Sequence, residues 1–189
     1  MYKRQSLTFF ANRFTDIISY APNPTPPANP YYCGTYFNTD LARARGVNLS
    51  TELRLKRWLS IDGYYTHLAT KVLQSNDTDP AYTTGAPLLR RPPNSGSIIV
   101  NVFYAKVNWN FIGYFTGPRS DVDFYTGQLA SNPGYARFDM TASYNVTHGL
   151  SATARVMNLF NKQYQDALGY AALGQTYYFG LRYRFSGRN

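Results

Sequence analysis

The chain contains little cysteine and no long apolar run. Cys33 is the single cysteine among 189 residues, so an intrachain disulfide is impossible. The two histidines, His67 and His148, lie far apart in the sequence and far from Cys33, so the spacing of a His/Cys zinc site is missing. No run of about 18 apolar residues occurs, which excludes a membrane-spanning helix.

Acidic residues are also scarce. Ten Asp and Glu stand against 19 Lys and Arg, for a net charge of +9. Such an excess occurs in nucleic-acid-binding proteins, where basic and aromatic residues share a groove. Here, however, basic residues occupy alternate positions of strand-like segments, as at Arg54, Lys56, Arg182 and Arg184. We therefore assign the excess to a lumen, a periplasmic rim or anionic lipopolysaccharide, and expect no nucleic-acid partner.

Residues that bring a reaction or a metal are missing from recognisable patterns. The sequence has no paired acid and base, nucleophile elbow, phosphate loop or metal cluster, so we expect neither an enzyme nor a cofactor. His148 has no acidic or thiol neighbour and is interpreted as a turn residue. Asp77 and Asp79 alternate as calcium ligands do, but the rest of a calcium loop is missing, and we favour a solvated turn.

Aromatic residues, in contrast, are abundant, at 17% of the chain. The clearest pattern lies at residues 175–185, QTYYFGLRYRF. Because strand side chains alternate between two faces, one face carries only large apolar or aromatic residues and the other carries two arginines. A strand of about ten residues with these faces is typical of a tilted bilayer crossing. The residues expected to face lipid are Tyr177, Phe179, Leu181, Tyr183 and Phe185.

The same alternation predicts an all-β, antiparallel, up-and-down transmembrane barrel segment of about eight strands. The predicted strands cover residues 6–20, 47–56, 59–66, 97–104, 107–115, 137–146, 150–156 and 175–185. Their connections alternate between turns of about two or three residues and loops of about 14 to 25 residues. Outer-membrane barrels have short periplasmic turns and long extracellular loops, and the sequence therefore predicts a location in the bacterial outer membrane.

Residues 155–164, RVMNLFNKQY, resemble the end of TonB-dependent outer-membrane receptors. The family's Asn-Leu-Phe-Asn/Asp-x-x-Tyr element is matched by Asn158, Leu159, Phe160, Asn161 and Tyr164, and Phe185 matches the terminal aromatic. The stretches TFFANRFTDIISY, RARGVNLSTELRL, GYYTHLATKV and LLRRPPNSGSI are similar to other family segments in order and spacing. The tail, residues 186–189, departs from the family by continuing past the terminal aromatic.

The resemblance implies a barrel of about 22 strands, a plug domain and a segment that contacts the TonB complex. Residues 6–185 would then be the C-terminal strands, about the last third of the barrel, and neither the plug nor the upstream strands are recognisable here. Residues 1–5 are interpreted as a truncation edge or foreign sequence, and residues 186–189 as a tail.

Two alternatives stay open. One is a complete eight-stranded barrel with a structural or adhesion role, since barrels of that size can close. It would confine four arginines with few acids in a narrow lumen, namely Arg54, Arg137, Arg155 and Arg182 with Glu52, Asp62 and Asp139. The other is a soluble basic binding module for single-stranded nucleic acid.

The receptor interpretation implies energised uptake of a scarce, bulky nutrient such as a ferric siderophore or cobalamin. The residues expected to face the lumen and plug are Arg54, Asp139, Arg155 and Arg182. Loop aromatics that could stack on a ligand are Tyr31, Tyr32, Tyr82, Tyr125 and Tyr170. The implied partners are outer-membrane lipid and lipopolysaccharide, the plug domain, the TonB complex and the barrel-assembly machinery.

Overall fold

The computed structural model describes residues 1–22, 34–75, 81–123 and 126–185, and for 17, 19–22 and 34–40 only the backbone. Among these residues, no helix is long and apolar enough to cross a membrane. The strands are β1 Tyr2–Pro22, β2 Gly34–Lys56, β3 Leu59–Gln74, β4 Asn94–Tyr104, β5 Val107–Thr116, β6 Arg119–Val122, β7 Leu129–Asn132, β8 Tyr135–Asn145, β9 Leu150–Met157, β10 Gln165–Ala167, β11 Tyr170–Ala171 and β12 Thr176–Tyr183.

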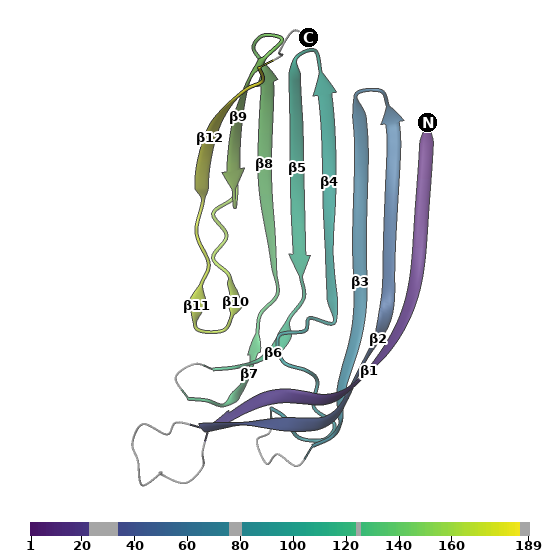
Figure 1. Ribbon diagram of the computed structural model, residues 1–189, viewed down its shortest axis with the longest axis vertical. Coiled ribbons are helices and arrows are strands. Elements are labelled where there is room, and N and C mark those ends of the chain that lie inside the picture. The colour runs from purple at the N-terminus through teal and green to yellow at the C-terminus, as the bar shows by residue number, and fades with distance from the viewer. Residues whose placement is uncertain (23–33, 76–80, 124–125, 186–189) are drawn as a thin grey trace.

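Eight of these strands form one antiparallel sheet in the order β1-β2-β3-β4-β5-β8-β9-β12. Each main strand therefore pairs with its neighbour in the sequence, as Figure 1 shows. The eight predicted strands and their up-and-down order are confirmed. Within the described residues, β1 and β12 lie at opposite edges of the sheet and do not pair with each other.

The two ends of the sheet differ. Three connections at one end are short, at residues 57–58, 105–106 and 146–149. At the other end, the predicted loops 117–134 and 161–174 each contain a small hairpin, β6–β7 and β10–β11. These four strands were not predicted because they have only two to four residues, too few to show a period.

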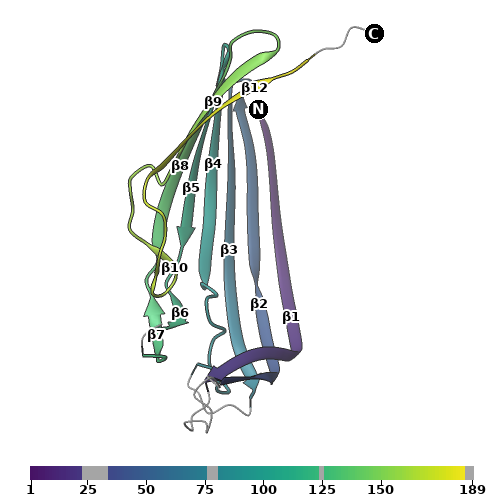
Figure 2. The same cartoon turned by 60° about the vertical axis from the view of Figure 1, so that its left-hand side comes forward.

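The first three strands are longer than predicted, and β3 continues to Gln74 beyond the predicted end at residue 66. Tyr2 pairs with Arg54, so residues 2–5 continue β1. β2 begins at Gly34, in the long connection expected between the predicted strands 6–20 and 47–56. Asp16 has φ of +55° and interrupts the β1–β2 register between Thr15 and Ile17. Beyond it the two strands turn sideways as an arm (Figure 1, Figure 2). The arm extends beyond the main sheet, so hydrocarbon does not impose an apolar alternation on its sequence.

The sheet lacks a large internal core. Among the residues that the structure describes, the buried apolar ones are Ala42 and Ala44 in β2, Val72 in β3 and Ala81 in the loop between β3 and β4. Most large apolar side chains are exposed instead, and water would disfavour such a surface. The stabilising apolar medium must therefore lie outside the sheet.

Candidate functional site

The apolar side of β12 is open to the surroundings. Tyr177, Phe179, Leu181 and Tyr183 occupy alternate positions and are 57% to 82% exposed. Phe185, just beyond the end of β12, packs its ring against Tyr183 at 4.6 Å between centroids. The five residues, four of them aromatic, thus form an exposed apolar stripe along one face.

The same side continues across the sheet. Residues directly opposite one another in a ladder share a face. The row through Phe179 consists of Ala154, Ala142, Trp109, Val102 and Leu59. Every member is apolar, so this apolar face spans six strands.

The opposite face is polar. Its row through Arg54 consists of Ser60, Asn101, Asn110, Thr141 and Arg155. Asn110 donates to Asn101 Oδ1 at 3.0 Å, and Asn101 donates to Ser60 Oγ at 3.2 Å and to Asp62 at 3.3 Å. A chain of side-chain hydrogen bonds therefore crosses β3, β4 and β5, which suits a water-filled or protein-filled lumen.

Asp139 is the buried centre of this polar face, at 1% exposure. Its carboxylate lies 3.3 Å from Arg137 Nε and 3.7 Å from Arg155, and it accepts a hydrogen bond of 2.9 Å from the backbone of Asn158. Arg137 also stacks on Tyr114 at 4.6 Å. Asp139 and Arg155 were expected to face the lumen, and the register puts both on this polar face. Arg137, two residues before Asp139, shares the face, although the sequence named it only for a closed eight-stranded barrel.

The other two predicted lumenal residues lie on the same face but elsewhere. Arg54 pairs with Glu52 at 2.8 Å in β2. Arg182 is opposite Ser151 near the turn end of β12. The four predicted residues thus share a face without forming one site.

The Asn-Leu-Phe-Asn element ends β9 and holds the following segment. Asn158 has φ of +52° and is 2% exposed. Its Oδ1 accepts from Lys162 N–H at 2.8 Å, and its Nδ2 donates to the carbonyls of Lys162 at 3.0 Å and Leu173 at 3.3 Å. Asparagine tolerates this backbone region, and here its side chain replaces strand partners.

Asn161 repeats this arrangement three residues later. Its φ is +49°, and its Oδ1 accepts from Gln175 N–H at 3.0 Å, just before β12. Phe160 packs edge-on against Phe138, with ring centroids 5.5 Å apart. The element is therefore a structural device that joins β8, β9 and the approach to β12.

A buried carboxylate joins the elaborated loops. Asp121, in β6, has no exposed surface. It accepts hydrogen bonds from Arg90 in the β3–β4 loop at 2.8 Å, from Leu168 N–H between β10 and β11 at 2.8 Å, and from Asn132 in β7 at 3.3 Å. Burial by itself raises the pKa of Asp121, but the hydrogen bonds from Leu168, Arg90 and other donors hold that pKa below its usual value.

Arg119 completes this loop network. It is 6% exposed and donates to the carbonyls of Gln165 at 2.7 Å and Asp166 at 2.8 Å. Three loop segments distant in the sequence are therefore tied together at the loop end of the sheet.

Two of the five predicted loop tyrosines, Tyr82 and Tyr170, belong to the described part of the chain, and they lie in different loops. Tyr82 is half-buried in the β3–β4 loop, and Tyr170, in β11, is 56% exposed. Tyr31, Tyr32 and Tyr125 lie outside the described residues.

A different tyrosine pair lies at the loop end of the polar face. Tyr135 and Tyr164 stack with centroids 4.3 Å apart beside a hollow of about 350 Å³ that Lys162 also lines. Sequence analysis assigned Tyr164 to the family element and did not consider Tyr135 as a ligand contact.

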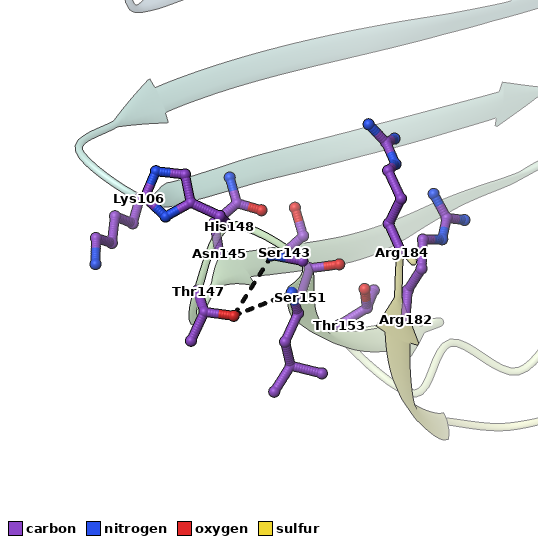
Figure 3. A pocket seen from close by; sticks show the side chains of 11 residues that line it. Lys106, Ser143, Asn145, Thr147, His148, Ser151, Thr153, Arg182 and Arg184 are labelled. Atoms are coloured by element: carbon purple, nitrogen blue, oxygen red, sulfur yellow. Dashed lines mark hydrogen bonds between the residues drawn. The ribbon is translucent and has the colours of Figure 1, made fainter. Parts of the chain in front are cut away.

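A second hollow, of about 580 Å³, lies at the turn end (Figure 3). Its lining includes the basic side chains of Lys106, Arg182 and Arg184, together with His148, and no acidic residue. Thr147 Oγ1 accepts hydrogen bonds from the backbone of Gly149 and Leu150, which confirms that His148 sits in a tight turn.

No metal cluster is found in the described ranges, where at no point do three His, Cys, Asp or Glu side chains gather. The two aspartates weighed as calcium ligands, Asp77 and Asp79, lie outside those ranges.

An antiparallel meander with one apolar face, one polar face, short turns at one end and elaborated loops at the other is the wall of an outer-membrane β-barrel. Residues 4–159 match the family described as TonB dependent receptor-like, beta-barrel. The chain belongs to that family, and it is an outer-membrane protein.

Similar proteins agree with this assignment. A curated relative, the vitamin B12 transporter BtuB of Vibrio cholerae, is 35% identical over 104 residues, which are 53% of this chain and 17% of the relative. The pyoverdine receptor FpvA of Pseudomonas aeruginosa PAO1 has a TM-score of 0.70 at 19% identity, over 97% of this chain and 27% of the receptor. The ferric-catecholate import receptor Fiu of K12 E. coli has a TM-score of 0.71 at 17% identity, over 97% of this chain and 25% of the receptor. The chain thus spans about a quarter or less of these relatives.

Proposed function

We propose that this chain forms part of the barrel wall of a TonB-dependent importer for a scarce, bulky nutrient such as a ferric siderophore or cobalamin. The observation that carries the proposal is the two-faced sheet of a family whose similar members are named as vitamin B12 and siderophore transporters. The protein would move its cargo without changing it, and the relatives are transporters and receptors rather than enzymes.

The open edges of the sheet support a larger barrel. Unpaired backbone groups in hydrocarbon cost several kcal/mol each, so β1 and β12 require partners within the membrane. Strands that precede β1 would supply them and complete a barrel of about 22 strands, of which residues 6–185 form the C-terminal part. Because residues 2–5 pair with β2, we include them in the wall and keep only residues 186–189 as a tail.

The polar face would line the lumen and contact a plug domain. Arg54, Asp139, Arg155 and Arg182 all project to this face, and pairs such as Arg155 with Asp139 hold their charges in place. A plug that carries polar groups would complete this surface, because isolated buried charge is costly. Coupling to the TonB complex would proceed through the plug, and lipid and lipopolysaccharide would surround the outer face.

The loop end would capture the cargo. The Asp121 network fixes three loop segments relative to one another, which reduces the entropy lost when a ligand binds. Tyr135 and Tyr164 offer an aromatic surface beside Lys162, facing the same side as the lumenal row. Large ligands with aromatic or macrocyclic groups suit such a surface.

Uptake measurements test the proposal. Cells with and without the gene are supplied with radiolabelled ferric siderophores and cobalamin, in backgrounds with and without TonB. We expect gene-dependent uptake of at least one cargo only when TonB is present. Uptake that does not depend on the gene for any cargo, or that continues without TonB, would contradict the proposal. A native chain that migrates as a compact, heat-modifiable eight-stranded barrel would instead favour the structural or adhesion alternative.

A further inference from the structure

The apolar face changes character at one level of β1, β2 and β3. On β1 and β2 its last apolar row pairs Phe9 with Val47, and on β3 the same row already holds His67. Two residues further toward the loop end, Ala11 lies opposite Arg45. Another two residues on, Arg13, Arg43 and Lys71 lie side by side in one row across β1, β2 and β3. Because steps of two residues keep the face, these four cations project outward, on the same side as the lipid-facing rows.

The inner face of the sheet changes from polar to apolar at the same level. Ala42, Ala44 and Val72 are buried there, at the level where the β3–β4 loop hydrogen-bonds to β3. The loop is anchored by hydrogen bonds of 2.8 Å from Val72 N–H to the carbonyl of Ala86 and from Gly85 N–H to the carbonyl of Val72. At this level, charged side chains therefore point outward and apolar side chains point inward. This is the reverse of the arrangement in the part of the strands nearer the turn end. A strand reverses in this way where it leaves hydrocarbon, so this level is the outer boundary of the membrane.

The outward cations lack ionic partners within the described structure. None of the ion pairs formed by described residues involves Arg13, Arg43, Arg45 or Lys71. Neighbouring strands lie about 4.8 Å apart, so Arg13, Arg43 and Lys71 span about 10 Å. We name these four residues the outer basic patch.

An apolar hollow of about 580 Å³ includes the glycines of the adjacent rows. Gly63 and Gly96 leave space between exposed Ile98 and Phe115. Position 96 accepts only glycine, because a Cβ atom there would lie 2.7 Å from the backbone carbonyl oxygen of Tyr64. This space faces hydrocarbon and has the lining that an acyl chain requires.

Polar groups edge this hollow on the side of the basic patch. Asn94 Oδ1 accepts a hydrogen bond of 2.7 Å from Tyr65 and lies 2.9 Å from His67 Nδ1. Apolar space, hydrogen-bonding groups and cations therefore follow one another in the order of a phosphorylated lipid, from acyl chain to headgroup.

We propose that the outer basic patch and the glycine-lined hollow together bind one molecule of lipopolysaccharide from the outer leaflet. Its phosphates lie on the patch, where arginine guanidinium groups form paired hydrogen bonds to phosphate oxygens, and one acyl chain occupies the hollow. This site depends on the outer-membrane location of the chain and not on the nature of the imported cargo.

Native mass spectrometry of the receptor purified from outer membranes tests the site. The probes are purified lipid A, dephosphorylated lipid A and phosphatidylglycerol, each added to delipidated protein. We expect lipid A to bind at least tenfold more tightly than either of the others. Equal binding of dephosphorylated lipid A would overturn the role of the phosphates, and equal binding of phosphatidylglycerol would overturn the choice of lipid.

Two variants separate the parts of the site. Replacement of Arg43, Arg45 and Lys71 by serine should weaken lipid A binding at least tenfold. Matched replacement of three turn-end cations, Arg57, Lys106 and Arg184, should leave it within twofold. Thr51→Phe, which fills the hollow, should weaken binding of lipid A at least fivefold while the basic patch stays intact.

Heat-modifiable migration confirms that each variant is folded. If the serine variant and its turn-end control bind lipid A equally, the site is wrong even when cargo uptake follows the proposed function. Conversely, a chain that fails to import any tested cargo but shows this lipid pattern retains the site.

Discussion

Asp121 and Arg90, 31 residues apart in the chain, are joined by a hydrogen bond of 2.8 Å from the arginine Nε to the carboxylate. The same carboxylate holds the backbone of Leu168, 47 residues further along. One buried side chain therefore links three loop segments at the loop end of the barrel wall.

Asp121→Asn should loosen these loops without unfolding the sheet. The amide replaces one acceptor oxygen with a donor, which then faces a donor N–H. We expect the local free energy of opening to fall by about 1–3 kcal/mol. The lost ion pair with Arg90 contributes little of this decrease, because the Arg90 side chain is half exposed. Hydrogen exchange of residues 165–172 measures the change.

Glu52→Gln is the matched control for that exchange measurement, since Glu52 pairs with exposed Arg54 far from the loops. Equal exchange of residues 165–172 in Asp121→Asn and in the unaltered protein would mean that Asp121 does not hold the loops.

The same network should respond to acid. The folded pKa of Asp121 is below its usual value of 3.8, so ionisation stabilises the folded loops above that pH. This contribution diminishes as the pH falls below about 4 and is lost as the pH passes the folded pKa. Protection of the Leu168 amide should decrease over this window, and Asp121→Asn should abolish this response. A response that persists in the variant would assign it to another carboxyl group.

Asn158 should be more sensitive to alanine than to glycine. Both changes remove the side-chain hydrogen bonds to Lys162 and Leu173, for about 2–3 kcal/mol. Alanine must also adopt φ of +52°, at a further cost of about 1 kcal/mol that glycine avoids. The temperature at which the folded receptor loses SDS resistance should therefore fall in the order native, glycine, alanine. The reverse order for the two variants would be incompatible with this backbone conformation.

Two neighbouring residues of β12 should differ strongly in how well they tolerate the same added charge. Phe179→Arg puts a cation on the apolar face and should cost about 2–4 kcal/mol near the bilayer midplane. Tyr178→Arg adds it to the polar face, opposite Arg155, and should cost much less. The amount of heat-modifiable receptor in the outer membrane reports the difference. Similar losses in both variants would show that the two faces are assigned wrongly.

The alternation of single residues made much of the wall predictable. A period of two assigns each residue to a face without knowledge of any partner, so Phe179 and Arg182 could be placed on opposite sides from β12 alone. Clusters of proline, glycine and asparagine marked the loop end. The small hairpins β6–β7 and β10–β11 were missed because strands so short have no readable period.

The sequence by itself thus determined the number of main strands, their order and their two faces, because these depend on neighbours a few residues away. Only the tertiary structure decided which residues meet at one level, such as Arg13, Arg43 and Lys71, or Asp121 with Arg90 and Leu168. Periodicity defines a face but not a height along the sheet. Height depends on the register between strands, which turns, bulges and bends such as that at Asp16 set together.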